Sequence, residues 1–134
     1  MLGESNFYPQ VARLIEEACE SAYLNSLRAA AVTLRVSAQL FVGAEVFGKD
    51  PNSPDLPRVR KMIQQLDGSH PPVTFSTGRK RTIVDSLTLV ARLGDTAAHP
   101  SVDATWRLLP LPSNVADGIT AIENLIAAAK GWAL

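Results

Sequence analysis

One segment constrains the fold more than any other, because between about Asn25 and Gly48 the chain is apolar on nearly every side of a helix. Asn25 has a side chain suited to cap such a helix, and Gly48 is suited to end it. A helix that is apolar all round belongs in the middle of a protein core. The segment therefore predicts the central helix of a bundle, with its main apolar stripe formed by Leu27, Ala30, Ala31, Leu34, Ala38, Phe41 and Val42.

Four other segments have helical periodicity, and no segment gives a strong strand signal. Their expected bounds are about 11–22, 55–66, 78–93 and 113–130. Asp55 is expected to cap the second of these helices, and Gly94 to take the left-handed conformation that often ends a helix. Together the five segments predict an all-α fold, an antiparallel bundle of four to five helices, in a single domain that spans residues 1–134.

Composition excludes several classes of protein. Hydrophobic residues make up 46% of the chain but aromatic residues only 6%, which suits close-packed helices more than a β-sandwich. Cys19 is the only cysteine, so we expect no internal disulfide, no Cys-based zinc site and a cytoplasmic location. We expect a protein that is neither secreted nor embedded in a membrane, because residues 1–6 show no basic region followed by an apolar run and no apolar run is long enough to span a membrane. No motif for a metal or a cofactor is present, and we expect neither.

The charge of the chain is balanced overall but unevenly distributed. The formal net charge is zero, which argues against a strongly basic nucleic-acid-binding domain. Between Pro51 and Arg92, however, basic residues outnumber the acidic Asp55, Asp67 and Asp85. A local basic surface is expected in this part of the chain, from Arg58, Arg60, Lys61, Arg79, Lys80, Arg81 and Arg92.

Arg92 is expected on the polar side of the helix over residues 78–93. Ile83, Leu87 and Val90 share one face at helical spacing, and the opposite face carries Arg81, Asp85, Thr88 and Arg92. Two interpretations of this polar face remain open. It is either an ordinary solvated stripe with an Arg–Asp pair four residues apart, or a surface that meets a second subunit or an anionic ligand.

Three cations, Arg79, Lys80 and Arg81, fall in the first turn of the same helix. The positive end of the helix dipole disfavours cations there, so local stability does not explain them. A phosphate bound at the exposed amides of this turn would explain them, since the dipole and the cations would then act together. Exposure to solvent without a ligand is an equally acceptable interpretation.

His99 and Asp95, together with Arg92, form a set of residues suited to proton transfer and phosphate binding. His99 precedes Pro100, which disfavours helical backbone and places His99 at a corner of the chain. Asp95 is close enough in sequence to orient the imidazole, and Arg92 lies about two helical turns back. Histidine transfers protons near neutral pH and arginine clamps phosphate oxygens, so the set suffices for metal-free phosphodiester chemistry. A corner histidine also commonly serves as a simple turn residue.

The chain resembles the HEPN superfamily, whose members are four- or five-helix bundles with an arginine followed by four to six residues and then a histidine. Six residues separate Arg92 from His99. The closer resemblance is to a bacterial branch of unknown function, through the sequences Leu27-Arg28-Ala29-Ala30-Ala31-Val32-Thr33-Leu34-Arg35 and Arg92-Leu93-Gly94-Asp95-Thr96-Ala97-Ala98-His99. In that branch a glutamate and an asparagine usually stand where this chain has Gln39 and Asp95.

The resemblance implies a homodimer in which the motifs of two subunits face one groove. The implied function is metal-independent RNA cleavage in a toxin or phage-defence system, with an antitoxin or other partner that holds it silent. His99 would transfer the proton, Arg92 would stabilise the phosphate and Asp95 would orient His99. Arg35 would contact phosphate or support the site, and Arg79, Lys80 and Arg81 would contact the RNA backbone.

The alternative is a HEPN-like dimer without catalytic activity that binds a nucleotide, a nucleic acid or a partner protein. The product of cleavage separates the two hypotheses, because attack by a ribose 2′-hydroxyl leaves a cyclic phosphate without added metal.

Overall fold

The computed structural model describes residues 11–17, 27–98 and 112–132, and these residues form helices and connecting loops without a strand. The helices are α2 (Leu27–Glu45), α3 (Val59–Leu66), α4 (Thr77–Ala98) and α5 (Pro112–Lys130), and residues 11–17 form a further helical segment. The all-α prediction is therefore confirmed for the described residues. The predicted N-cap Asn25 and the second half of the predicted first helix lie outside them.

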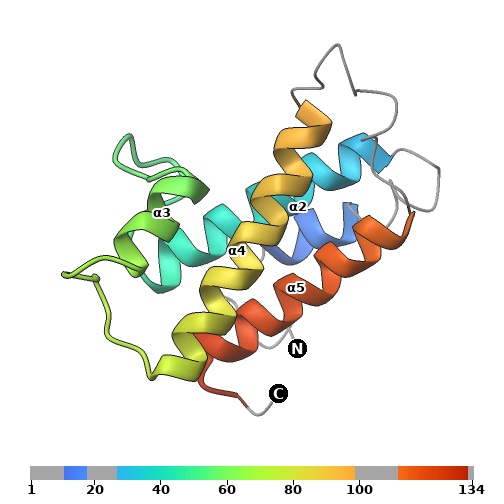
Figure 1. Ribbon diagram of the computed structural model, residues 1–134. Coiled ribbons are helices and arrows are strands. Elements are labelled where there is room, and N and C mark those ends of the chain that lie inside the picture. The colour runs from blue at the N-terminus through green and yellow to red at the C-terminus, as the bar shows by residue number, and fades with distance from the viewer. Residues whose placement is uncertain (1–10, 18–26, 99–111, 133–134) are drawn as a thin grey trace.

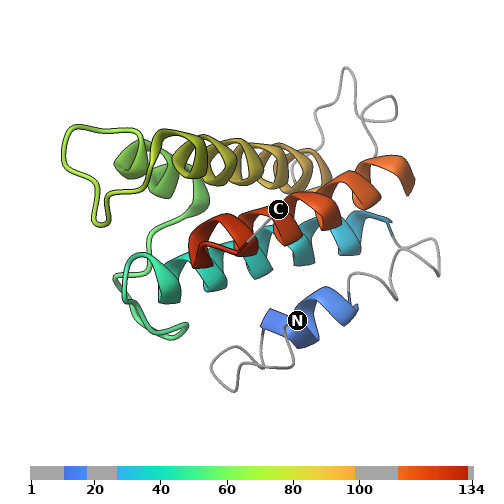
Figure 2. The same ribbon diagram turned by 90° about the horizontal axis from the view of Figure 1, so that it is seen from below.

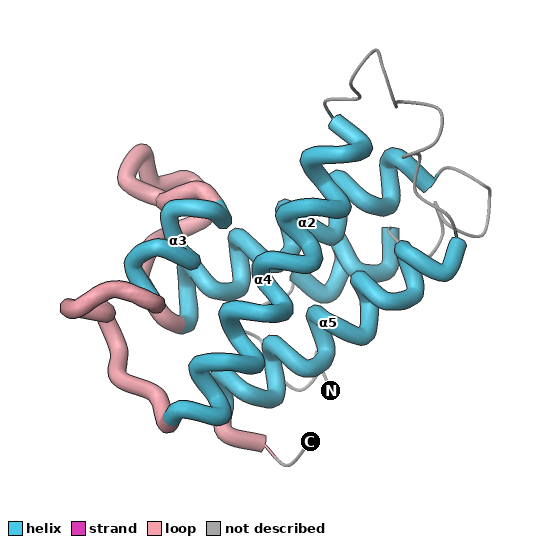
Figure 3. The backbone as a smooth tube through the Cα atoms, viewed as in Figure 1, coloured by secondary structure: helices cyan, strands magenta, loops and turns pink. Residues whose placement is uncertain are grey.

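The helices pack into a bundle in which α4 contacts each of α2, α3 and α5. α4 runs in the opposite direction to α2 and α5, while α2 and α5 run in the same direction (Figures 1 and 2). The bundle is thus antiparallel at its two largest contacts, α4 with α5 and α4 with α2. The short helix α3 and the loops before and after it lie together at one side of the molecule (Figure 3).

The core is one cluster of aliphatic side chains around Phe41, with contributions from each of the four labelled helices and from the segment 11–17. As predicted, α2 lies in the middle of the bundle, since it packs against α3, α4 and α5, and α4 likewise packs against the other three labelled helices. Its buried Ser37 donates a hydrogen bond to the carbonyl of Thr33, so this polar group is satisfied inside the core. No helix in the described part of the chain is both long enough and apolar enough to cross a membrane.

Two glycines end helices in the left-handed conformation. Gly48 follows α2 with a φ of 63°, and Gly131 follows α5 with a φ of 73°. An L-residue with a side chain rarely adopts this backbone, and glycine adopts it without steric cost. The predicted role of Gly48 at the end of the central helix is confirmed.

Two predicted helix ends are wrong. Gly94 does not end α4, which continues to Ala98, and the reason is that Gly94 provides a close approach to Arg35 of α2 rather than a turn. Asp55 does not cap α3, which begins at Val59 after Arg58. Pro57 disfavours helical backbone at the preceding residue, so the helix starts later than the apolar pattern suggests. In the loop, Oδ2 of Asp55 instead lies 3.8 Å from Nζ of Lys49.

Candidate functional site

A pocket of about 400 Å³ lies where α2, α3 and α4 meet. Its polar lining is strongly basic, with three arginines and a single carboxylate. We call it the basic pocket, and it is lined by Arg35, Gln39, Arg58, Val59, Arg60, Ala91 and Asp95.

Helical spacing explains how α2 and α4 build the pocket. Arg35 and Gln39 are four residues apart on α2, and Ala91 and Asp95 are four residues apart on α4, so each pair lies on one face of its helix. Gly94 brings the two helices together, because its missing Cβ would lie 2.8 Å from the Cβ of Arg35. Gln39 also donates a hydrogen bond of 2.9 Å to the carbonyl of Pro57, which fixes the loop before α3.

Asp95 links three helices through two arginines. Its Oδ1 accepts a hydrogen bond of 2.8 Å from Nη1 of Arg35 on α2. Its Oδ2 accepts hydrogen bonds from Arg60 on α3, one of 2.9 Å from Nε and another from Nη2. Both oxygens of the carboxylate are therefore engaged, and α2, α3 and α4 are joined at the edge of the pocket.

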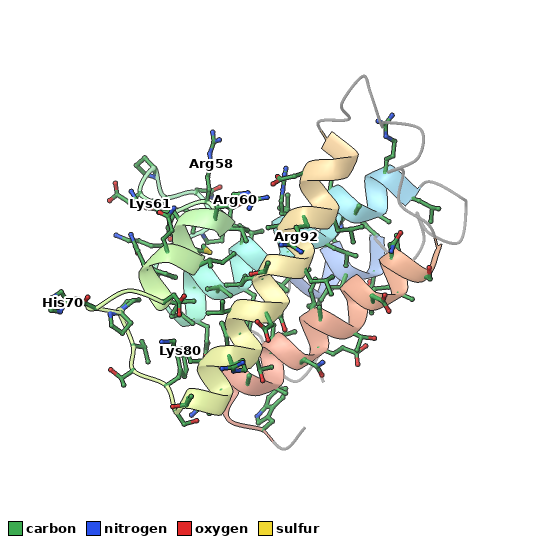
Figure 4. All side chains as sticks on the ribbon, viewed as in Figure 1. Arg58, Arg60, Lys61, His70, Lys80 and Arg92 are labelled. Atoms are coloured by element: carbon green, nitrogen blue, oxygen red, sulfur yellow. The ribbon has the colours of Figure 1, made fainter. Side chains whose placement is uncertain are left out.

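Arg58 and Arg60 lie at the N-terminal end of α3, where the helix dipole disfavours positive charge. Arg58 is the N-cap residue, and its side chain makes no capping hydrogen bond. In Figure 4, Arg60 extends from α3 toward α4, and Arg58 extends away from the start of α3. The carboxylate of Asp95 on α4 accounts for Arg60. The stability of α3 does not explain Arg58, whereas an anion bound beside it would.

The environment of Asp95 favours its charged form. Partial burial raises the pKa of the carboxyl, but the hydrogen bond and positive charge of Arg60, followed by those of Arg35, outweigh burial and hold the pKa below its ordinary value of 3.8. Asp95 is consequently ionised at every pH above about 4.

Stability should depend on pH through this carboxyl. A group whose pKa is lower in the folded state contributes stability above its unfolded pKa, and that contribution is lost as the pH falls through the folded pKa. We therefore expect Asp95→Asn to be less stable than the wild type at pH 7, and the difference to shrink as the pH falls below about 4. Urea denaturation of both proteins from pH 7 to pH 2 measures this. A difference that stays constant over the range would contradict the role of the Asp95 charge.

Of the three predicted catalytic residues, the structure describes Arg92 and Asp95, and only Asp95 lines the basic pocket. Arg92 is exposed on α4, as predicted (Figure 4). It is not among the residues that line the basic pocket. Asp95 is bound to Arg35 and Arg60, so both of its oxygens have partners other than an imidazole. His99 lies outside the described residues.

Of the predicted phosphate-contacting residues, Arg35 lies in the basic pocket. Arg79 is occupied elsewhere, since it donates hydrogen bonds to the carbonyls of Ala128 and Ala129 at 2.7 and 3.1 Å and stacks over the ring of Phe75. It thereby satisfies carbonyls at the C-terminal end of α5, where a cation is favourable.

Lys80 and Arg81 follow Arg79 in the first turn of α4. The ammonium group of Lys80 lies 3.5 Å from the carboxylate of Asp67, in a pair whose side chains are both substantially exposed. Arg81 is exposed. Neither residue lines the basic pocket, so the predicted cluster of three cations is not part of this site.

The sequence interpretation did not identify Gln39, Arg58 or Arg60 as site residues. A signal was present for the two arginines, because they lie near the start of a predicted helix, as Arg79 and its neighbours do. The helix-dipole argument applies equally to both groups. Gln39 carries no comparable signal, because only packing shows that it faces Pro57.

No known protein family matches the chain, and no curated protein or solved structure is significantly similar to it. Among the described residues, no group of three histidine, cysteine, aspartate or glutamate side chains could hold a metal ion.

Proposed function

We propose that the chain binds a phosphate-bearing ligand, an RNA or a nucleotide, in the basic pocket. The observation that supports this best is that three arginines, from α2 and from the start of α3, are among the residues lining a pocket with one carboxylate. Arginine binds phosphate oxygens through paired hydrogen bonds, and such charge-assisted bonds are stronger than neutral ones. This function corresponds to the non-catalytic HEPN-like alternative.

Binding of RNA should depend on Arg58. Labelled single-stranded RNA should bind the purified full chain with an affinity that falls as salt rises, and Arg58→Gln should weaken binding about tenfold. Arg58 is exposed, and none of the hydrogen bonds or ion pairs among the described residues uses its side chain, so the variant should stay folded. Fluorescence anisotropy measures the affinity, and circular dichroism verifies the fold.

The matched control is Arg28→Gln. Arg28 is exposed on α2 and does not line the pocket, so this variant loses the same charge at another place on the surface. It should bind RNA nearly as well as the wild type. Equal losses in both variants would indicate a diffuse electrostatic attraction, and the absence of binding to RNA and to nucleotides would refute the proposal.

A second candidate is metal-independent RNA cleavage by Arg92 and His99 at the groove of a homodimer, in a toxin or phage-defence system. It is favoured by one observation, the exposure of Arg92 on a face of α4 that also exposes Leu89 and Asp85. If two copies met through this face in an antiparallel arrangement, Arg92 of each copy would pair with Asp85 of the other.

Incubation of RNA with the protein and a metal chelator tests cleavage directly. A cyclic phosphate product that disappears in His99→Ala and Arg92→Ala would establish the second candidate. Light scattering should then show a dimer, which the substitution Leu89→Lys should convert to a monomer. If the RNA stays intact at every protein concentration, the cleavage candidate is refuted and binding in the basic pocket remains as the proposed function.

A further inference from the structure

The basic pocket has more positive charge than one internal phosphate of a nucleic-acid strand can neutralise. Three positive charges against the single negative charge of Asp95 leave a net charge of +2. Asp95 carries its negative charge at neutral pH, because the hydrogen bonds and positive charges of Arg60 and Arg35 hold the pKa of its carboxyl below the ordinary value of 3.8. An internal phosphodiester carries one negative charge, whereas a terminal phosphate carries about −1.5 to −2 at pH 7. The charge of the pocket matches the terminal group.

The hydrogen-bond donors of the pocket lead to the same ligand. An arginine side chain has five N–H donors, and Arg35 uses one Nη1 donor on Asp95 while Arg60 uses Nε and Nη2. The guanidinium of Arg58 is engaged by none of the described residues. A terminal phosphate offers three unesterified oxygens and an internal phosphate only two. A terminal phosphate therefore has one unesterified oxygen for each of the three arginines that line the pocket.

The size and the remaining lining of the pocket suit a single small group. A volume of about 400 Å³ lies in the lower part of the range for small-ligand pockets. Val59 and Ala91 provide apolar surface, and Gln39 provides an uncharged polar group beside the arginines. These side chains leave room for the sugar that carries the phosphate.

We propose that the basic pocket recognises a terminal phosphate, a phosphomonoester, in preference to the internal phosphodiesters of a strand. This inference rests on the proposed function and adds the class of ligand. The phosphomonoester can come from a free nucleoside 5′-monophosphate or from the 5′-phosphorylated end of an RNA. Both sources present the same dianion to Arg35, Arg58 and Arg60.

Two RNAs of identical sequence, one with a 5′-phosphate and one with a 5′-hydroxyl, test the preference. With a label at the 3′ end of each and the full chain in solution, the 5′-phosphorylated RNA should bind about tenfold more tightly. Arg58→Gln should reduce this ratio toward one, and Arg28→Gln should leave it unchanged. A nucleoside 5′-monophosphate that displaces the RNA would identify the free nucleotide as a ligand too, whereas a preference without such displacement would identify the RNA end.

The outcomes of this experiment separate a failure of the terminal-phosphate preference from a failure of the proposed RNA or nucleotide binding. Equal affinities for the two RNAs, with binding that still depends on Arg58, would overturn the preference for a terminal phosphate and leave RNA binding in place. Binding of neither RNA nor nucleotide would overturn both. A preference for the 5′-phosphate that persists unchanged in Arg58→Gln would also overturn the inference, because the selective group would then lie outside the basic pocket.

Discussion

Replacing Phe41 with alanine is expected to lower the free energy of unfolding by about 3–5 kcal/mol. Phe41 is fully buried in α2, the helix that contacts α3, α4 and α5. The substitution removes a large apolar side chain from water-excluded surroundings and leaves a cavity that the neighbouring helices can fill only in part. A single domain has a total stability of only about 5–15 kcal/mol, so much of it would be lost. Urea denaturation monitored by circular dichroism measures the change.

Trp132→Ala is the control for Phe41→Ala. Trp132 is also a large aromatic residue, but it is 40% exposed and follows the end of α5. Its replacement should have a clearly smaller effect on stability. If both substitutions cost the same, Phe41 would not occupy the centre of the core.

Replacing Gly94 with alanine is expected to lower the free energy of unfolding by about 1–3 kcal/mol. Alanine inside a helix is normally more stabilising than glycine by about 0.5–1 kcal/mol, so the expected sign is the reverse of the usual one. The reason is that the new Cβ would lie 2.7 Å from Cδ and 2.8 Å from Cβ of Arg35. The Cβ atom of Arg35 is attached directly to the backbone of α2, so α2 and α4 would have to move apart.

Gly78→Ala is the matched control on the same helix. Gly78 is exposed near the start of α4, and no atom lies within 4 Å of the position of its missing Cβ. This substitution should leave the protein unchanged or stabilise it by up to about 1 kcal/mol. Opposite signs for the two glycines in urea denaturation would establish the close approach of α2 and α4. A stabilising effect of Gly94→Ala would contradict it.

Gly94 also shows why part of the site could not be predicted from the sequence. The glycine between Arg92 and His99 resembles a helix end, and the local pattern contains nothing that separates an end from a close contact between helices. The contact depends on Arg35, which lies 60 residues before Asp95 in the chain. Only the packing of α2 on α4 brings Gly94, Asp95 and Arg35 together.

Arg79 illustrates the same limit. Its place in the first turn of α4 suggested either a contact with a bound phosphate or a cation exposed without a ligand, because the dipole of its own helix disfavours it there. In the structure it satisfies the end of a different helix, α5, through the carbonyls of Ala128 and Ala129. Arg79 is therefore stabilised by hydrogen bonds to α5, and one of its partners, Ala128, lies 49 residues away in the sequence.

The sequence alone determined the helical class of the described residues, the central position of α2, the left-handed end at Gly48 and the exposure of Arg92. These properties follow from local periodicity and local backbone preference, which act over a few residues. The tertiary structure decided the rest. It continued α4 through Gly94 to Ala98, tied Asp95 to Arg35 and Arg60, and built the basic pocket from three helices. Such contacts depend on how the faces of the helices pack. The local sequence around a residue does not indicate which distant residue it will contact.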